Sequence, residues 1–255
     1  VLALLLLIVY FTAPLLGWQR STLTSSAGAT ATPAPSPTAV PESQPYRAVW
    51  VSYLEWQQVD FSSAQSFTAD ISTMLDNIAA LGATVVLAQV RPFGDALYPS
   101  NYYPFSHLCT GVQGQDPGFD PLALLMQAAH ARGLQLEAWI NPYRLQSGNF
   151  PLLCAQSPAL THPEWTKTTA NGLYLDTANA EVRTSIADAV AELCRNYPLD
   201  GIHFDDYFYP TIDPAFDADD YAAAGTSLSL ADWRRENVNA LMELCHAAAQ
   251  QLHQC

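Results

Sequence analysis

Short apolar runs alternate with stretches of helical spacing from about residue 45 onward. The runs are rich in β-branched and aromatic residues and predict strands at 48–53, 83–90, 134–140 and 201–205. The stretches between them have apolar side chains every three or four positions and predict helices at 67–81, 121–132, 180–197 and 230–252. This alternation predicts an α/β fold with a parallel sheet and right-handed crossovers.

The faces of the predicted strands favour a barrel over an open doubly wound sheet. In the strand at 134–140, Leu136 and Ala138 share an apolar face, whereas Glu137 and Trp139 share a mixed one. Alternation in the second strand likewise predicts that Gln89 and Arg91 share a polar face. An open parallel sheet is covered on both faces and should be apolar on both. There is also no glycine-rich phosphate turn after the first strand. We therefore expect a TIM-type (β/α)8 barrel.

Only part of such a barrel is expected in this chain. A complete barrel takes eight strands and about 250 residues, and the pattern shows four strands after residue 45. We expect the chain to supply about the first four β/α units of an incomplete, truncated barrel.

The first 44 residues differ in composition from the rest. Residues 1–18 are almost entirely apolar and predict a signal peptide or an N-terminal membrane anchor, with cleavage and retention both open. Residues 19–44 are rich in Ser, Thr, Ala and Pro and predict a disordered linker. Residues 45–255 form the predicted barrel domain. We expect an exported protein, secreted or membrane-anchored, that meets the membrane only through its N-terminal segment.

Charge and cysteine content exclude several classes of partner. With 10 basic and 24 acidic residues, the formal charge of −14 argues against nucleic acid. No CxxC pair is present, so a zinc site or other cofactor is not expected.

Cys109 and Cys154 could form a disulfide, whereas Cys194 and Cys245 lie on apolar helix faces. Oligomeric state is not predicted.

The segment 200–210 carries the strongest candidate chemistry. His203 and Asp205 share one face of the predicted strand, and Asp206 and Tyr207 follow where it ends. Asp205 is a candidate catalytic acid or electrostatic stabiliser, or else the acceptor of a salt bridge from Arg91. Asp206 is a second catalytic candidate or a loop cap.

His203 leaves three interpretations open. It is a candidate substrate-binding residue, a metal ligand together with Asp205, or an interior histidine bonded to Glu137 or Gln89.

Other strand ends are expected to bring polar groups to the same rim. These groups are Ser52, Glu55, Arg91, Asp95, Asn141, Tyr143 and Arg144. Carboxylates and amides bind sugar hydroxyls, and aromatic rings stack on sugar faces, so this rim suits a polysaccharide. Arg91 and Arg144 either bind substrate or hold carboxylates in place. We expect Tyr143, Tyr207 and Tyr209 to lie above the rim as candidate aromatic platforms for a sugar.

Five segments resemble the bacterial glycosyl hydrolase-like 10 family. They are RAVWVSY at 47–53, QVRPFGDALY at 89–98, GFDPL at 118–122, AWINPYR at 138–144 and DGIHFDDYFYP at 200–210. The resemblance implies a (β/α)8 barrel in an exported or lipid-anchored envelope protein. It also implies glycoside hydrolysis, with peptidoglycan glycan strands as the substrate class. By position, the family's rim residues are Arg91, Asp95, Asn141, Arg144, Asp205 and Asp206.

The leading hypothesis is therefore a cell-envelope glycosidase that uses two carboxylates, one of them Asp205. A partner carboxylate could be Asp206, Asp95 or an acid beyond residue 255. Two alternatives remain, a barrel that binds glycan without cleaving it and a metal-dependent deacetylase or hydrolase that uses His203 and Asp205.

Overall fold

The computed structural model describes residues 45–205 and 207–250. Its centre is a four-stranded parallel sheet with the spatial order β1-β2-β3-β6. The strands are β1 (Ala48–Val51), β2 (Val85–Arg91), β3 (Gln135–Ile140) and β6 (Gly201–Phe204). Neighbours in space are thus also successive parallel strands in sequence, as the alternation predicted. The expectations for residues 1–18 and 19–44 lie outside the described residues.

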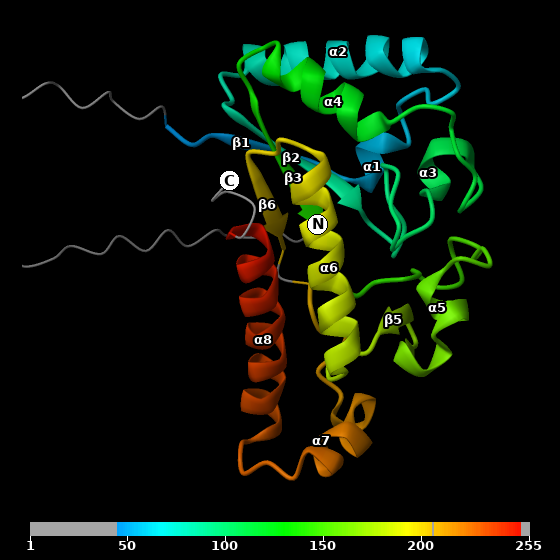
Figure 1. Ribbon diagram of the computed structural model, residues 1–255, viewed down its shortest axis with the longest axis vertical. Helices are drawn as coiled ribbons and strands as arrows, with labels where there is room; N and C mark the ends of the chain where they lie inside the picture. The colour runs from blue at the N-terminus through cyan, green and yellow to red at the C-terminus, as the bar shows by residue number, and fades with distance from the viewer. Residues whose placement is uncertain (1–44, 206, 251–255) are drawn as a thin grey trace, which may run out of the picture. The chain divides into compact units, whose positions relative to one another are not determined.

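A long helix follows each strand of this sheet (Figure 1). The helices are α2 (Ala64–Ala80), α4 (Pro121–His130), α6 (Ala180–Asn196) and α8 (Leu230–Gln250). α2 packs on α4, and α6 packs on α8. Right-handed crossovers that always step in the same direction place every helix on the same face of the sheet. This arrangement is the wall of a barrel and differs from a doubly wound sheet.

The two faces of the sheet differ in burial. Leu136, Ala138 and Ile140 lie on the helix-covered face and are at most 1% exposed. They pack in one core with helix residues such as Ile71 and Leu75. Burying each such large side chain contributes about 1.5–3 kcal/mol. On the opposite face Trp50 is 59% exposed. The helix-covered face therefore holds the core, and the other face presents side chains to the barrel interior.

The first strand ends earlier than predicted. Ser52 is the N-cap of the short helix α1 (Tyr53–Trp56), and its backbone N–H donates to Glu55 Oε2 at 2.7 Å. The Ser52 side chain accepts in return from within the first turn. This capping box occupies the two groups that the sequence placed at the rim. The prediction of a strand through residue 53 was wrong because a local helix start competes there.

An antiparallel hairpin interrupts the long connection between β3 and α6. It consists of β4 (Thr166–Thr169) and β5 (Gly172–Leu175). Gly172 has φ +139°, and a Cβ there would lie 2.1 Å from the carbonyl oxygen of Gln146. The sequence did not predict this hairpin, because the run TKTT has no alternation of apolar and polar residues.

The remaining elements are short segments in the connections. They are α3 (His107–Thr110), α5 (Pro158–Thr161), α7 (Ala218–Ala224) and two 3₁₀ turns, Pro163–Trp165 and Pro214–Phe216. None of the helices within 45–205 and 207–250 combines the length and apolar character that crossing a bilayer requires.

The four cysteines in the described part of the chain are free thiols. The disulfide considered between Cys109 and Cys154 is therefore not formed in this structure. Cys245 is buried in the core, as its helical position suggested, whereas Cys194 is half-buried.

Candidate active site

Asp205 follows directly after β6 and borders a hollow on the barrel-interior face. The hollow has a volume of about 660 Å³ and is lined by Trp50, Trp139, His203, Phe204, Asp205 and Phe208. Asp205 Oδ1 accepts a hydrogen bond from the backbone N–H of Tyr207 at 3.1 Å. A carboxylate at a strand's carboxyl end, beside two tryptophans, is suited to act on a bound sugar.

His203 is bonded to the first strand and not to the partners that the sequence suggested. Trp50 Nε1 donates to His203 Nε2 across 3.2 Å. Gln89 instead accepts from the backbone N–H of Tyr53, and Glu137 accepts from the hydroxyl of Tyr46. Because Nε2 acts as an acceptor, the ring proton of neutral His203 is on Nδ1.

Aromatic side chains and an arginine lie close together at the carboxyl ends of the strands. The Tyr207 ring is 36% exposed, and its hydroxyl lies 3.1 Å from the hydroxyl of Tyr174 in β5. Burial raises the pKa of Tyr174, and the nearby charge of Arg144 opposes that rise. The Arg144 guanidinium lies 4.5 Å from the centre of the Phe93 ring. Arg144 is thus held against an aromatic face at the mouth of the strands.

Arg91 does not share a face with Gln89, contrary to the prediction. The β2–β3 register shifts between these residues, so Gln89 pairs with Trp139 and Arg91 pairs with Ile140. The shift turns Arg91 to the helix-covered side, where it is 1% exposed. There its guanidinium lies 4.1 Å from the centre of the Tyr103 ring. No ion pair between Arg91 and Asp205 occurs among the described residues.

Asp95 is completely buried beneath the rim. Its Oδ2 lies 3.1 Å from His107 Nδ1 and 3.4 Å from Gln113 Nε2. Gln113 Oε1 in turn accepts from the backbone N–H of Cys154 at 3.1 Å. Asp95 therefore ties together two loops that follow neighbouring strands, and it offers no surface to a ligand in this structure.

Asn141 and Tyr143 are also buried, at 2% and 1% exposure. Asn141 Oδ1 accepts from the backbone N–H of Arg144 at 3.4 Å and so shapes the turn that carries Arg144. Burial raises the pKa of Tyr143. The expectation that Tyr143 lies above the rim was wrong, because its ring is packed into the core. Asn141 and Tyr143 support the rim from below in this structure.

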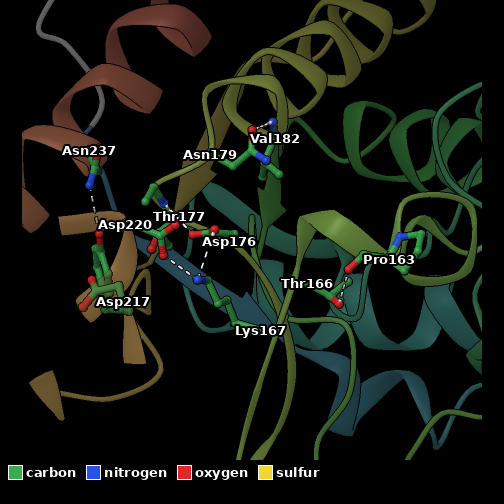
Figure 2. A network of polar contacts seen from close by, with 12 residues as sticks. Pro163, Thr166, Lys167, Asp176, Thr177, Asn179, Val182, Asp217, Asp220 and Asn237 are labelled. Carbon is green, nitrogen blue, oxygen red and sulfur yellow. Dashed lines mark hydrogen bonds and ion pairs between the residues drawn. The ribbon is translucent and has the colours of Figure 1, made fainter. Parts of the chain in front are cut away.

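Three charged side chains that the sequence did not single out meet between the connections that follow β3 and β6. Lys167 of β4 lies between Asp176, just after β5, and Asp220 of α7 (Figure 2). Burial raises the pKa of Asp176. Spacing alone gave no signal for this contact, because 53 residues separate Lys167 from Asp220.

Two further predictions concern Asp206 and a metal ion. Asp206 lies outside the described residues. Across 45–205 and 207–250, no three His, Cys, Asp or Glu side chains gather in a metal-binding arrangement.

Three comparisons place the chain among known proteins. The family model for glycosyl hydrolase-like 10 matches residues 45–250. The chain is 36% identical over 207 residues to glycosyl hydrolase YngK of Bacillus subtilis, covering 77% of this chain and 41% of that protein. It is 36% identical over 232 residues to glycosyl hydrolase DigH of Escherichia coli, covering 82% of this chain and 53% of that protein. The chain thus spans about half the length of these relatives.

The fold comparison agrees with the sheet order. An α-L-fucosidase from Paenibacillus thiaminolyticus superposes with a TM-score of 0.52 over 81% of this chain and 31% of the fucosidase, at 16% identity. At this identity the match supports the fold, a partial (β/α) barrel, and nothing about substrate. Together with the family match, these observations show that the chain belongs to the glycosyl hydrolase-like 10 family.

Proposed function

We propose that the complete protein containing these residues hydrolyses glycosidic bonds in a cell-envelope polysaccharide, with peptidoglycan glycan strands as the substrate. The position of Asp205 carries the proposal. Its carboxylate borders the same hollow as Trp50, Trp139 and His203. The tryptophan rings supply apolar surface for sugar faces, while the carboxylate lies where a glycosidic oxygen or an anomeric carbon could approach.

The proposed chemistry needs two carboxylates on opposite sides of the scissile bond. They lie about 5 Å apart in retaining glycosidases and about 6.5–9.5 Å apart in inverting ones. Asp205 is one member of the pair, as the acid that protonates the leaving oxygen or as the group that stabilises the developing cation. Asp95 is not available as its partner in this structure, because it is buried and bonded to His107. Asp206, or an acid beyond residue 255, takes the second role in this proposal.

The side chains at the carboxyl ends of the strands suit the binding of a polysaccharide. Tyr207 presents a partly exposed ring beside Asp205, and Arg144 lies against Phe93. The overall charge of −14 leaves nucleic acid a poor partner. In this proposal residues 1–18 direct export or anchor the protein, so that the domain faces the envelope glycan.

The test is product analysis with the complete protein on purified peptidoglycan glycan strands, and on chitin oligosaccharides as a second substrate. New reducing ends, with pairs of fragments whose masses sum to that of the parent strand plus one water, would support glycoside hydrolysis. Glycan binding without new ends would instead support the non-catalytic alternative. Release of acetate that strong chelators abolish would support the metal-dependent deacetylase.

A further inference from the structure

One lysine joins two segments that follow neighbouring strands of the sheet. Lys167 lies in the connection after β3, and its ammonium contacts Asp220 of α7 in the connection after β6 (Figure 2). The same ammonium lies 3.6 Å from Asp176 Oδ2, just after β5. Lys167 therefore binds one carboxylate of its own connection and one of the neighbouring connection.

This group of three charges is partly withdrawn from water. The side chains of Lys167, Asp176 and Asp220 are 25%, 9% and 32% exposed. Asp176 has one further hydrogen bond, from the backbone N–H of Ala178 at 2.9 Å. Removing the ammonium would leave a buried carboxylate without its cation, which costs far more than losing an exposed ion pair. Asp176 therefore holds the Lys167 ammonium in place within its own connection, and the same ammonium pairs with Asp220 of the neighbouring connection.

A second contact joins the same two segments. The hydroxyl of Tyr174 in β5 lies 3.1 Å from that of Tyr207. The backbone N–H of Tyr207 donates to Asp205 Oδ1. A continuous set of contacts therefore runs from the β4–β5 hairpin to the candidate catalytic carboxylate.

The helix that follows holds the other side of the segment after β6. Arg234 of α8 binds both oxygens of Asp217, at 2.8 and 2.5 Å. Asn237 Nδ2 donates to the hydroxyl of Tyr209 at 3.2 Å. α8 thus holds one side of the segment, and the contacts with Lys167 and Tyr174 hold it on the side of the β4–β5 hairpin.

We propose that Lys167 is a positioning residue that holds the segment 205–229 against the β4–β5 hairpin and thereby fixes Asp205 and Tyr207 over the bound glycan. The effect on turnover rests on the proposed glycosidase function, whereas the effect on the segment itself does not. A misplacement of about 1 Å at a catalytic group can reduce turnover roughly 100-fold.

The test compares Lys167→Met, Lys167→Arg and Asp220→Asn in the complete protein containing residues 1–255. Asp76→Asn is the matched control, because Asp76 of α2 also pairs across two elements, with Arg132 just after α4, and that pair lies outside the segment measured. Two properties are measured for each variant. The first is the rate of backbone hydrogen exchange in 205–229, by mass spectrometry, and the second is the pair of kinetic constants kcat and KM on glycan strands. Asp220→Asn removes only the partner across the two segments, so it serves if Lys167→Met fails to fold.

We expect Lys167→Met and Asp220→Asn to speed exchange in 205–229 and to lower kcat by up to roughly 100-fold, with a smaller change in KM. Lys167→Arg should restore both quantities, and Asp76→Asn should change neither. Unchanged exchange in 205–229 in both Lys167→Met and Asp220→Asn would overturn the proposal. A wild-type protein that cleaves no glycan would refute the proposed function, and the exchange data would still decide the role of Lys167.

Discussion

Trp50 in β1 donates its indole N–H to His203 Nε2 in β6 across 3.2 Å. These strands form the two edges of the described sheet, with β2 and β3 between them. Three strand spacings in a flat sheet would separate the edges by about 14 Å. Two side chains can meet across that span only if the sheet curls toward their face. The hydrogen bond therefore indicates that the sheet is curved like a barrel wall. It also places the His203 imidazole beside Asp205 on the concave side of the sheet.

Replacing Trp50 with Phe removes the indole N–H and retains an aromatic ring. We expect a loss of about 1 kcal/mol or less in the free energy of unfolding, because Trp50 is largely exposed. Nitrogen NMR of His203 checks the bond directly. Neutral wild-type His203 should carry its proton on Nδ1, and the variant should show a mixture of both tautomers. An Nε2-protonated ring in the wild type would contradict the bond.

Replacing Gly172 with Ala should strongly destabilise the hairpin. The new Cβ would lie 2.1 Å from the Gln146 carbonyl oxygen, and φ at Gly172 is +139°. The strained backbone alone costs about 1–3 kcal/mol, and the contact with backbone adds to that. Gly118→Ala is the control, since it also has a positive φ but meets nothing within 4 Å. In urea unfolding, the free energy of unfolding should be much lower for Gly172→Ala than for Gly118→Ala. Equal losses of stability in the two variants would refute the close approach.

Asp95→Asn should lower stability and leave glycan affinity unchanged. The buried carboxylate accepts from His107 and Gln113, and hydrogen bonds to a charged group contribute about 1.5–3 kcal/mol. We expect a loss of about 2 kcal/mol in denaturant unfolding. A variant of normal stability that binds glycan poorly would show instead that Asp95 contacts the substrate.

Asp176 should give the stability a measurable pH dependence. Burial raises the pKa of this carboxyl above its ordinary value of 3.8. The folded state then binds the proton more tightly than the unfolded state, so the contribution of Asp176 to stability falls as pH rises from about 3.8 through the folded pKa. The free energy of unfolding of wild type minus that of Asp176→Asn should therefore decrease between pH 4 and pH 7. A difference that grows over this range would contradict the direction of the shift.

The strands and long helices could be predicted from the sequence because each repeats a local period. In β3 the alternation of Leu136, Ala138 and Ile140 with Glu137 and Trp139 gave the two faces correctly. The position of Arg91 was not predicted, because strand alternation alone does not show the β2–β3 register shift between Gln89 and Arg91 that reverses its face. Ser52 was assigned to a strand because its capping role depends on the helix that follows.

The candidate site was predictable only at the strand ends. His203 and Asp205 follow from strand alternation, and both border the hollow. Their partners could not be inferred, since Trp50 lies 153 residues from His203 in sequence. Lys167 was missed for the same reason, because its contact with Asp220 depends on the packing of two separate connections.

The most direct test of the account is the turnover of Asp205→Asn on purified peptidoglycan glycan strands, measured as new reducing ends in the complete protein. Asp219→Asn, which alters an exposed carboxylate in the same segment, is the control. We predict that Asp205→Asn lowers kcat by roughly 100- to 10,000-fold without changing the melting temperature, and that Asp219→Asn retains full activity. Undiminished cleavage by a folded Asp205→Asn protein would contradict the account.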